Sequence, residues 1–253
     1  MHQFKRLAFA TMIAISLPAL ADELPPVTPY RPSVASPAQL PAPGQLELEI
    51  GGLSVKTNGD RRDSLPYQLK LALSDQWGLL LGGEAFISDR QGGDRSSGIG
   101  DTSFTLKRAF ALDDKTGLGL ELTAKAPTAK DSLGSGKADY TLNGIFSKDI
   151  GALHMDLNLN ETRLGAIDPG AGRMQTGWAA SFSSALDERW TATTELSGTR
   201  QSHAPHTAQL LAALTYSPTP RMAIDIGVAK GLTDASQDWS IFSGIVLPLA
   251  NFW

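Results

Sequence analysis

Hydrophobic residues recur at every second position along most of this chain, and the positions between them are polar or charged. In one such segment, Phe104 and Leu106 alternate with Ser103, Thr105 and Lys107. A period of two residues is typical of a β-strand with one apolar and one polar face. Twelve segments of this kind follow residue 44, separated by turn sequences such as NG and DD, and no amphipathic helix interrupts them. The pattern therefore predicts an all-β fold.

Alternation alone fits both a soluble sheet, whose apolar face packs into a core, and a membrane barrel, whose apolar face meets lipid. The connections favour the barrel, because short turns, expected at 74–76, 113–115, 148–151, 187–189 and 217–220, alternate with longer glycine-rich loops. This is the rhythm of periplasmic turns and extracellular loops. We therefore predict a transmembrane antiparallel up-and-down β-barrel of about 12 strands over residues 45–253.

Residues 1–21 have the layout of a cleaved signal peptide. Lys5 and Arg6 precede an apolar run, and Ala19-Leu20-Ala21 supplies the small residues that a signal peptidase accepts. The run is too short to cross ~30 Å of hydrocarbon, and no later stretch approaches about 18 apolar residues. We expect export, cleavage after Ala21 and residence in the bacterial outer membrane.

Residues 22–44 hold 7 of the 15 prolines. This density disfavours both helix and sheet ladder and favours extended polyproline conformations. The favoured interpretation is a proline-rich periplasmic arm that acts as a spacer, and a plug or a partner-binding segment is the alternative. The predicted organisation is thus a signal peptide (1–21), a periplasmic arm (22–44) and a barrel (45–253).

Composition and motifs restrict the chemistry. A net charge of -4 argues against a nucleic-acid partner, and the absence of cysteine excludes thiol catalysis, disulfides and thiolate metal sites. His154 is the only histidine in a predicted strand, and Asp156 lies on the same face about 7 Å away. No serine carries a nucleophile motif. We expect no enzymatic activity, no cofactor and no metal site.

In a membrane barrel the polar faces line the lumen, where charge is tolerated. Twelve strands imply a narrow lumen that admits small solutes. We predict the following lumen-lining residues: Asp101, Lys107, Glu121, Lys125, His154, Asp156, Asn158, Arg173, Glu195 and Asp225.

Residues 98–128 are predicted to form an antiparallel hairpin in which the odd-numbered positions of both strands are polar. Like faces must pair, so a three-residue turn at 113–115 places Lys107 opposite Glu121. A turn shifted by one residue at each boundary would place Ala109 there instead. In a wet lumen the ion pair is expected to contribute a few tenths to about one kcal/mol.

The last strand carries a pattern that resembles the terminal signal recognised by the barrel assembly machinery. Trp253 is preceded by Leu249, Leu247 and Ile245 at alternate positions, and Asn251 interrupts the pattern. Pro248 is awkward in such a strand, because proline has no N–H to donate to a ladder. The machinery is therefore an expected partner, together with outer-membrane lipid.

Three segments, "SGIGDTSFTLKRAF", "GLGLELTAKAPT" and "LGSGKADYTLNGIFSKDIGALHMDLNLN", resemble the family of outer-membrane transporters associated with the meta pathway of phenol degradation. The resemblance implies a barrel of the twelve-strand type that lets small hydrophobic or aromatic compounds cross the outer membrane, and it supplies no catalytic residues. The expected function is passive passage of such solutes. A non-conducting structural or receptor barrel and an outer-membrane lipid hydrolase are the alternatives.

Overall fold

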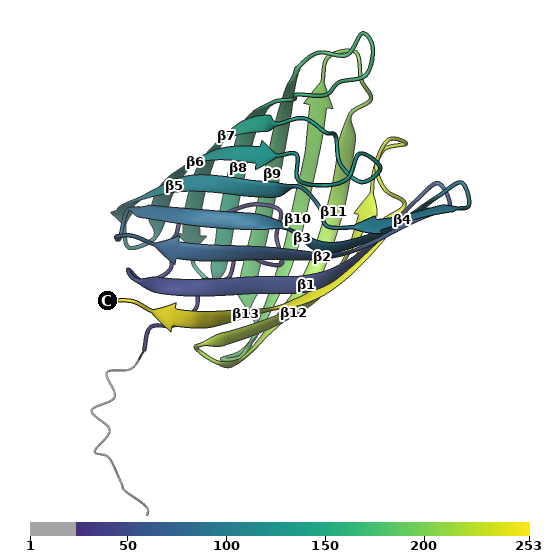
Figure 1. Ribbon diagram of the computed structural model, residues 1–253. Helices are drawn as coiled ribbons and strands as arrows, with labels where there is room; N and C mark the ends of the chain where they lie inside the picture. Colours follow the sequence, from purple (N-terminus) through teal and green to yellow (C-terminus); the bar gives the residue numbers. More distant parts are fainter. Residues whose placement is uncertain (1–23) are drawn as a thin grey trace, which may run out of the picture.

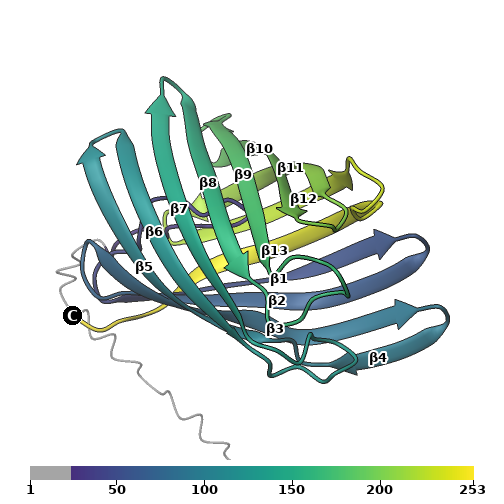
Figure 2. The ribbon, with the colours of Figure 1, turned by 90° about the horizontal axis from the view of Figure 1, so that it is seen from above.

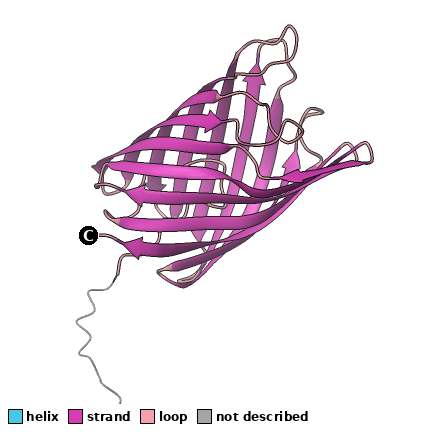
Figure 3. Ribbon diagram, viewed as in Figure 1, coloured by secondary structure: helices cyan, strands magenta, loops and turns pink. Residues whose placement is uncertain are grey.

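The structure, a computed structural model, describes residues 24–253, and the predicted signal peptide lies outside them. The described chain consists of antiparallel strands and loops (Figure 3). None of its segments is a helix long and apolar enough to cross a membrane. The strands are β1 (Gln45–Thr57), β2 (Asp60–Ala72), β3 (Trp77–Gln91), β4 (Asp94–Gly98), β5 (Thr102–Asp113), β6 (Thr116–Ala126), β7 (Asp139–Ile150), β8 (Leu153–Arg163), β9 (Met174–Ala185), β10 (Trp190–Gln201), β11 (Thr207–Thr219), β12 (Met222–Gly231) and β13 (Trp239–Asn251).

Twelve of these strands close into a barrel, which confirms the predicted fold class. Each strand pairs with its neighbours along the chain, and the pairing of β1 with β13 closes the ring (Figure 1). The short strand β4 is an addition that the sequence did not indicate. It pairs only with residues 87–91 at the end of β3, whereas residues 77–82 at the start of β3 pair with β5. Strand β4 thus extends a hairpin beyond the barrel wall.

The two faces of the barrel wall differ as the alternation predicts. On β6, Leu120 and Leu122 expose 47% and 56% of their surface, whereas Glu121 between them exposes 8%. Most apolar side chains therefore point outward around the barrel and most polar ones point inward; Arg108, which stacks on the outward rings of Trp77 and Phe110, is an exception. This arrangement is stable only if lipid replaces water outside, because an exposed apolar surface of this extent is unfavourable in water.

The predicted register of the β5–β6 hairpin is confirmed, since Lys107 pairs with Glu121. The turn is shorter than predicted. Asp113 still belongs to β5 and pairs with Thr116, because a bulge after Ala111 shifts the register by one residue. Other turns also differ at their bounds: β7 continues to residue 150 and β11 to residue 219, so the connections at these points are only two residues long.

The turn between β1 and β2 is an exception to the predicted alternation of short and long connections. It consists of Asn58 and Gly59 alone, although it lies at the end of the barrel that carries the longer loops. Their φ angles are 52° and 94°, as a tight hairpin of this kind requires. Asparagine and glycine adopt such angles more readily than other residues.

Pro248 lies in β13 at a position where the β12–β13 ladder requires no N–H group from it. The pairing of β12 with β13 ends at Val246, so no strand on that side requires an N–H from Pro248. On the other side, Glu47 lies opposite Pro248 next to a bulge in β13, where Leu249 is the extra residue. Leu249 and Trp253 expose 52% and 66% of their surface. Their recognition by the assembly machinery stays a prediction.

The assignment of faces predicts different costs for two adjacent substitutions in β6. Leu122→Arg places a charge in the lipid and should lower the free energy of unfolding by about 2–4 kcal/mol. Thr123→Arg points inward and should cost only about 1 kcal/mol, the loss of the 2.7 Å hydroxyl hydrogen bond with Thr105. Urea unfolding in lipid vesicles, followed by tryptophan fluorescence, measures both. Equal costs would contradict the assignment.

Candidate functional site

Residues 24–44, called the arm below, run inside the barrel. The arm enters at the end with the short turns, where the Val27 N–H donates to the Pro220 carbonyl at 2.9 Å, and it leaves at the same end, where the Gly44 N–H donates to Ala72. Between these points it forms a loop within the ring of strands (Figure 2). A spacer would lie outside the barrel. The structure instead places the segment in the position that the plug alternative describes.

The arm is bound to the wall by side chains and forms no β-ladder with it. Its prolines lack N–H groups, and its remaining buried N–H groups need acceptors. Inward-pointing side chains supply these acceptors: Glu49 accepts from the Tyr30 N–H at 2.7 Å, and Asn158 accepts from the Ser36 N–H at 2.9 Å. Hydrogen bonds connect the arm to β1, β2, β5, β6, β7, β8, β9, β10 and β12.

Glu195 on β10 binds two successive backbone groups of the arm. Its Oε2 accepts from the N–H groups of Val34 and Ala35, both at 2.8 Å. The carboxylate is almost fully buried, and its Oε1 has no hydrogen-bond partner within residues 24–253. Glu195 therefore depends on the arm for its hydrogen bonds.

Tyr30 lies between two buried lysines at the centre of this contact. The Lys70 and Lys107 Nζ atoms are 4.1 and 4.0 Å from the centroid of its ring, within the range of cation–π interactions. The phenol hydroxyl donates to the Gln39 carbonyl at 2.6 Å. Burial raises the pKa of Tyr30 well above its ordinary value, and nearby carboxylates, Glu121 first, raise it further. The phenol is therefore neutral.

Carboxylates on the wall neutralise both lysines. Lys70 Nζ lies 2.9 Å from Glu47 and 2.6 Å from Glu49, and Lys107 Nζ lies 3.0 Å from Glu121. Both lysine side chains are completely buried, because the arm covers them. The arm therefore shields both ammonium groups from solvent. This corrects the expectation of a solvated, weak Lys107–Glu121 pair.

Nine of the ten predicted lumen-lining residues fall into three groups. Lys107, Glu121, Asp156, Asn158, Glu195 and Asp225 are buried at the level of the arm. At the opposite end, Lys125 bridges Asp101 and Asp139 at 3.1 and 2.7 Å. Arg173 does not line the lumen: it precedes β9, is exposed, and donates to the carbonyls of Leu164 and Gly165 in a loop.

His154 lies near the short-turn end of the barrel, with both ring nitrogens beside carboxylates. Nδ1 is 2.6 Å from Asp149 and Nε2 is 3.2 Å from Asp156. Ser147 donates to Asp156 and not to the imidazole. A serine hydrolase needs a histidine nitrogen that takes the proton of the serine, and His154 has none free. In the part of the chain that the structure describes, no group of three potential metal ligands is assembled.

Several arm-binding residues were missed by the sequence prediction. Glu47 and Glu49 alternate with the leucines of β1, and Lys70 alternates with Leu69 and Leu71. The same alternation that identified Lys107 would have placed all three inside the barrel. Arg31 could not have been found in this way, because the arm has no periodicity.

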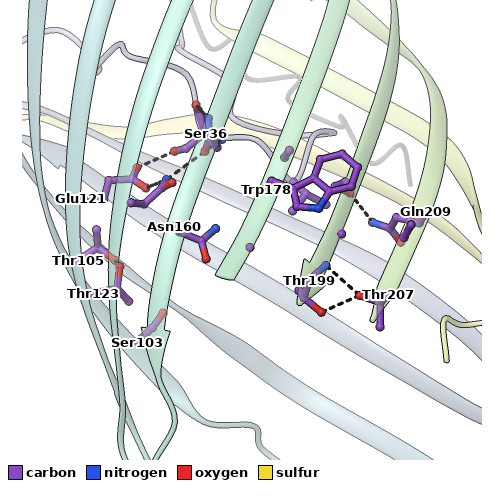
Figure 4. A pocket seen from close by; sticks show the side chains of 18 of the residues that line it. Ser36, Ser103, Thr105, Glu121, Thr123, Asn160, Trp178, Thr199, Thr207 and Gln209 are labelled. Carbon is purple, nitrogen blue, oxygen red and sulfur yellow. Dashed lines mark hydrogen bonds between the residues drawn. The ribbon is translucent and has the colours of Figure 1, made fainter. Parts of the chain in front are cut away.

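Between the arm and the end of the barrel with the longer loops, the lumen contains a chamber of about 510 Å³ (Figure 4). Its lining is mostly uncharged hydroxyl and amide side chains, and Glu121, bound to Lys107 and Ser36, is the charged residue among them. The chamber has the size of a small-molecule site. Lining residues labelled in Figure 4 include Ser103, Thr105, Thr123, Asn160, Thr199, Thr207 and Gln209.

Comparison with known proteins supports the resemblance seen in the sequence. A family model described as "Putative MetA-pathway of phenol degradation" matches residues 30–249. No curated protein matches the chain.

Solved barrels share the fold at low sequence identity. The COG4313 outer membrane channel from Pseudomonas putida F1 is 15% identical, with a TM-score of 0.65 over 84% of this chain and 98% of that chain. The NanC porin is 11% identical, with a TM-score of 0.60 over 80% and 100% of the two chains. The CymD monoaromatic hydrocarbon channel is 8% identical, with a TM-score of 0.53 over 83% and 90%. These likenesses concern the fold.

The burial of the Lys107–Glu121 pair predicts a large effect of breaking it. Glu121→Gln leaves an uncompensated buried ammonium and should lower the free energy of unfolding by about 3–5 kcal/mol. Adding Lys107→Met removes that charge and should recover part of the loss. In the exposed Arg61–Asp63 pair, Asp63→Asn should cost less than about 1 kcal/mol. Urea unfolding of the wild type and the three variants tests this, and a cost for Glu121→Gln as small as that for Asp63→Asn would indicate a solvated pair.

Proposed function

The chain belongs to the family described as "Putative MetA-pathway of phenol degradation", and we propose that it is an outer-membrane channel for passive passage of small hydrophobic or aromatic compounds. The outward apolar face supports a place in the membrane, because such a surface requires lipid. The predicted signal peptide supports export. We place the end with the short turns in the periplasm, as in other outer-membrane barrels.

The chamber is the observation that carries the proposal. A closed wall surrounds about 510 Å³ of space, and the arm lies between this space and the short-turn end. Hydroxyl and amide groups line the chamber, so a small polar substituent such as a phenolic hydroxyl would find partners there. The lining offers no free cation to attract an acidic solute. Neutral small molecules therefore fit the chamber best.

The arm is the segment whose movement would open the channel. Mainly side-chain contacts hold it: hydrogen bonds between neutral groups contribute about 0.5–1.5 kcal/mol net each, and those to charged groups such as Glu195 contribute about 1.5–3 kcal/mol. No backbone ladder of the wall needs to break when the arm leaves. We therefore propose that this arrangement is the closed channel and that the wall stays intact on opening.

Transport is tested on outer-membrane vesicles from cells with and without the protein. Labelled benzyl alcohol should enter several-fold faster in the presence of the protein, whereas an acidic oligosaccharide should not. Equal rates for benzyl alcohol would favour the structural or receptor barrel. Release of fatty acid from phospholipid in the same vesicles would instead favour the lipid hydrolase.

A disulfide between arm and wall tests the role of the arm. The chain has no cysteine, and the Ser33 and Ser181 hydroxyl oxygens are 2.8 Å apart, so Ser33→Cys with Ser181→Cys should form a disulfide without large movement. The oxidised double variant should lose most of the uptake, and reduction should restore it. Ser33→Cys alone is the control. Uptake that is insensitive to oxidation would show that solutes pass with the arm in place.

A further inference from the structure

Three adjacent strands contribute one row of inward positions beside the arm. Gly51 on β1 pairs with Gly244 on β13, and Gly244 pairs with Asp225 on β12. The row therefore consists of two residues without side chains followed by a carboxylate. Such a row forms a flat floor with an acidic edge.

The guanidinium of Arg31 occupies this floor. Its Nε lies 2.8 Å from Asp225 Oδ2 and its Nη2 lies 2.9 Å from Oδ1, a two-point pairing that matches the planar fork of a guanidinium to a carboxylate. The Asp225 side chain exposes only 2% of its surface, so this ion pair is largely removed from water.

The glycine at position 244 is explained by the space that the guanidinium needs. A Cβ atom there would lie 2.5, 2.6 and 2.7 Å from Arg31 Nε, Cζ and Nη2. A Cβ on Gly51 would also approach Arg31 Nη2 and Cζ, at 2.8 and 2.9 Å, although it would meet the Ser243 carbonyl as well. Neither glycine has a positive φ. The backbone conformation at Gly244 would therefore allow other residues. Glycine is needed there because the guanidinium of Arg31 occupies the space of a Cβ atom.

A second cavity of about 250 Å³ adjoins this place. Arg31, Glu49, Tyr67 and Gln68 are among the residues that line it. The cavity offers room for the remainder of a small molecule whose cationic group lies on the glycine floor. Arg31 is also the only charged residue among residues 24–44. It is therefore the one side chain of the arm whose place beside Asp225 a diffusible cation can take.

We propose that Asp225, Gly244 and Gly51 form a binding site for small molecules with a guanidinium or amidinium group, and that Arg31 is its internal occupant. A soluble ligand of this class competes with Arg31 and favours release of the arm. Binding stands on the geometry of the site alone. The opening that follows release rests on the proposed channel function.

Calorimetric titration with methylguanidine tests binding on the full chain. In Arg31→Gln the site is vacated, so this variant should bind methylguanidine with saturation, and the wild type at least about tenfold more weakly. Methylammonium, which lacks the planar fork, should bind the variant poorly. Adding Gly244→Ala should abolish binding, because its Cβ occupies the place of the cation. Absence of binding to folded Arg31→Gln, or unchanged binding with Gly244→Ala, would overturn the proposal.

A second measurement avoids the dependence on how Arg31→Gln folds. Ser33→Cys, with Arg31 intact, reports exposure of the arm through its rate of modification by a maleimide. Methylguanidine should raise this rate several-fold with saturation, and methylammonium at equal ionic strength should not. Equal effects of the two cations would overturn the competition with Arg31. If methylguanidine binds and exposes the arm while benzyl alcohol uptake is absent, the site stands and the proposed channel function fails.

Discussion

Closure of the sheet into a barrel leaves each strand side chain two directions, into the lumen or towards lipid. In a twelve-strand barrel with lipid outside, each polar residue at alternate positions points into a lumen too narrow to be a bulk aqueous phase. Glu47, Glu49, Lys70, Lys107 and Glu195 are all brought there by the same alternation. Buried charges need partners. Some lie on neighbouring strands, and the arm supplies the others.

The arm and the wall are complementary in their hydrogen-bonding groups. A proline-rich segment has few N–H groups and cannot extend a sheet, so it fits a lumen that offers isolated side-chain acceptors better than one that offers a strand edge. Carboxylates on the wall accept from the arm's backbone, and lysines on the wall donate to its carbonyls, as Lys107 does to Pro37 at 2.6 Å. The Tyr30 ring fills the space between the two ammonium groups.

Periodicity made the wall predictable and left the arm unpredictable. The strand faces, the barrel and the pairing of Lys107 with Glu121 follow from the parity of residue numbers, because a pleated strand allows only two directions for a side chain. Parity does not apply to loops, which is why Arg173 was misplaced. It also says nothing about residues 24–44, whose position depends on contacts with strands up to 194 residues away. Because the position of the arm could not be predicted, the sequence suggested a wet lumen. The strength of the Lys107–Glu121 ion pair was therefore underestimated.

The arm's entry and exit at one end of the barrel determine how it responds to force. A pull on the start of the arm loads the hydrogen bonds to the Pro25 and Pro26 carbonyls first and the Val27–Pro220 bond next. The contacts of Thr28, Tyr30 and Arg31 follow in order. The segment peels from the wall one contact at a time. A strand in a ladder, pulled along its length, would have to shear all its bonds together. Mechanical extraction of the arm therefore requires little force at any moment, although the total work is the sum of all its contacts.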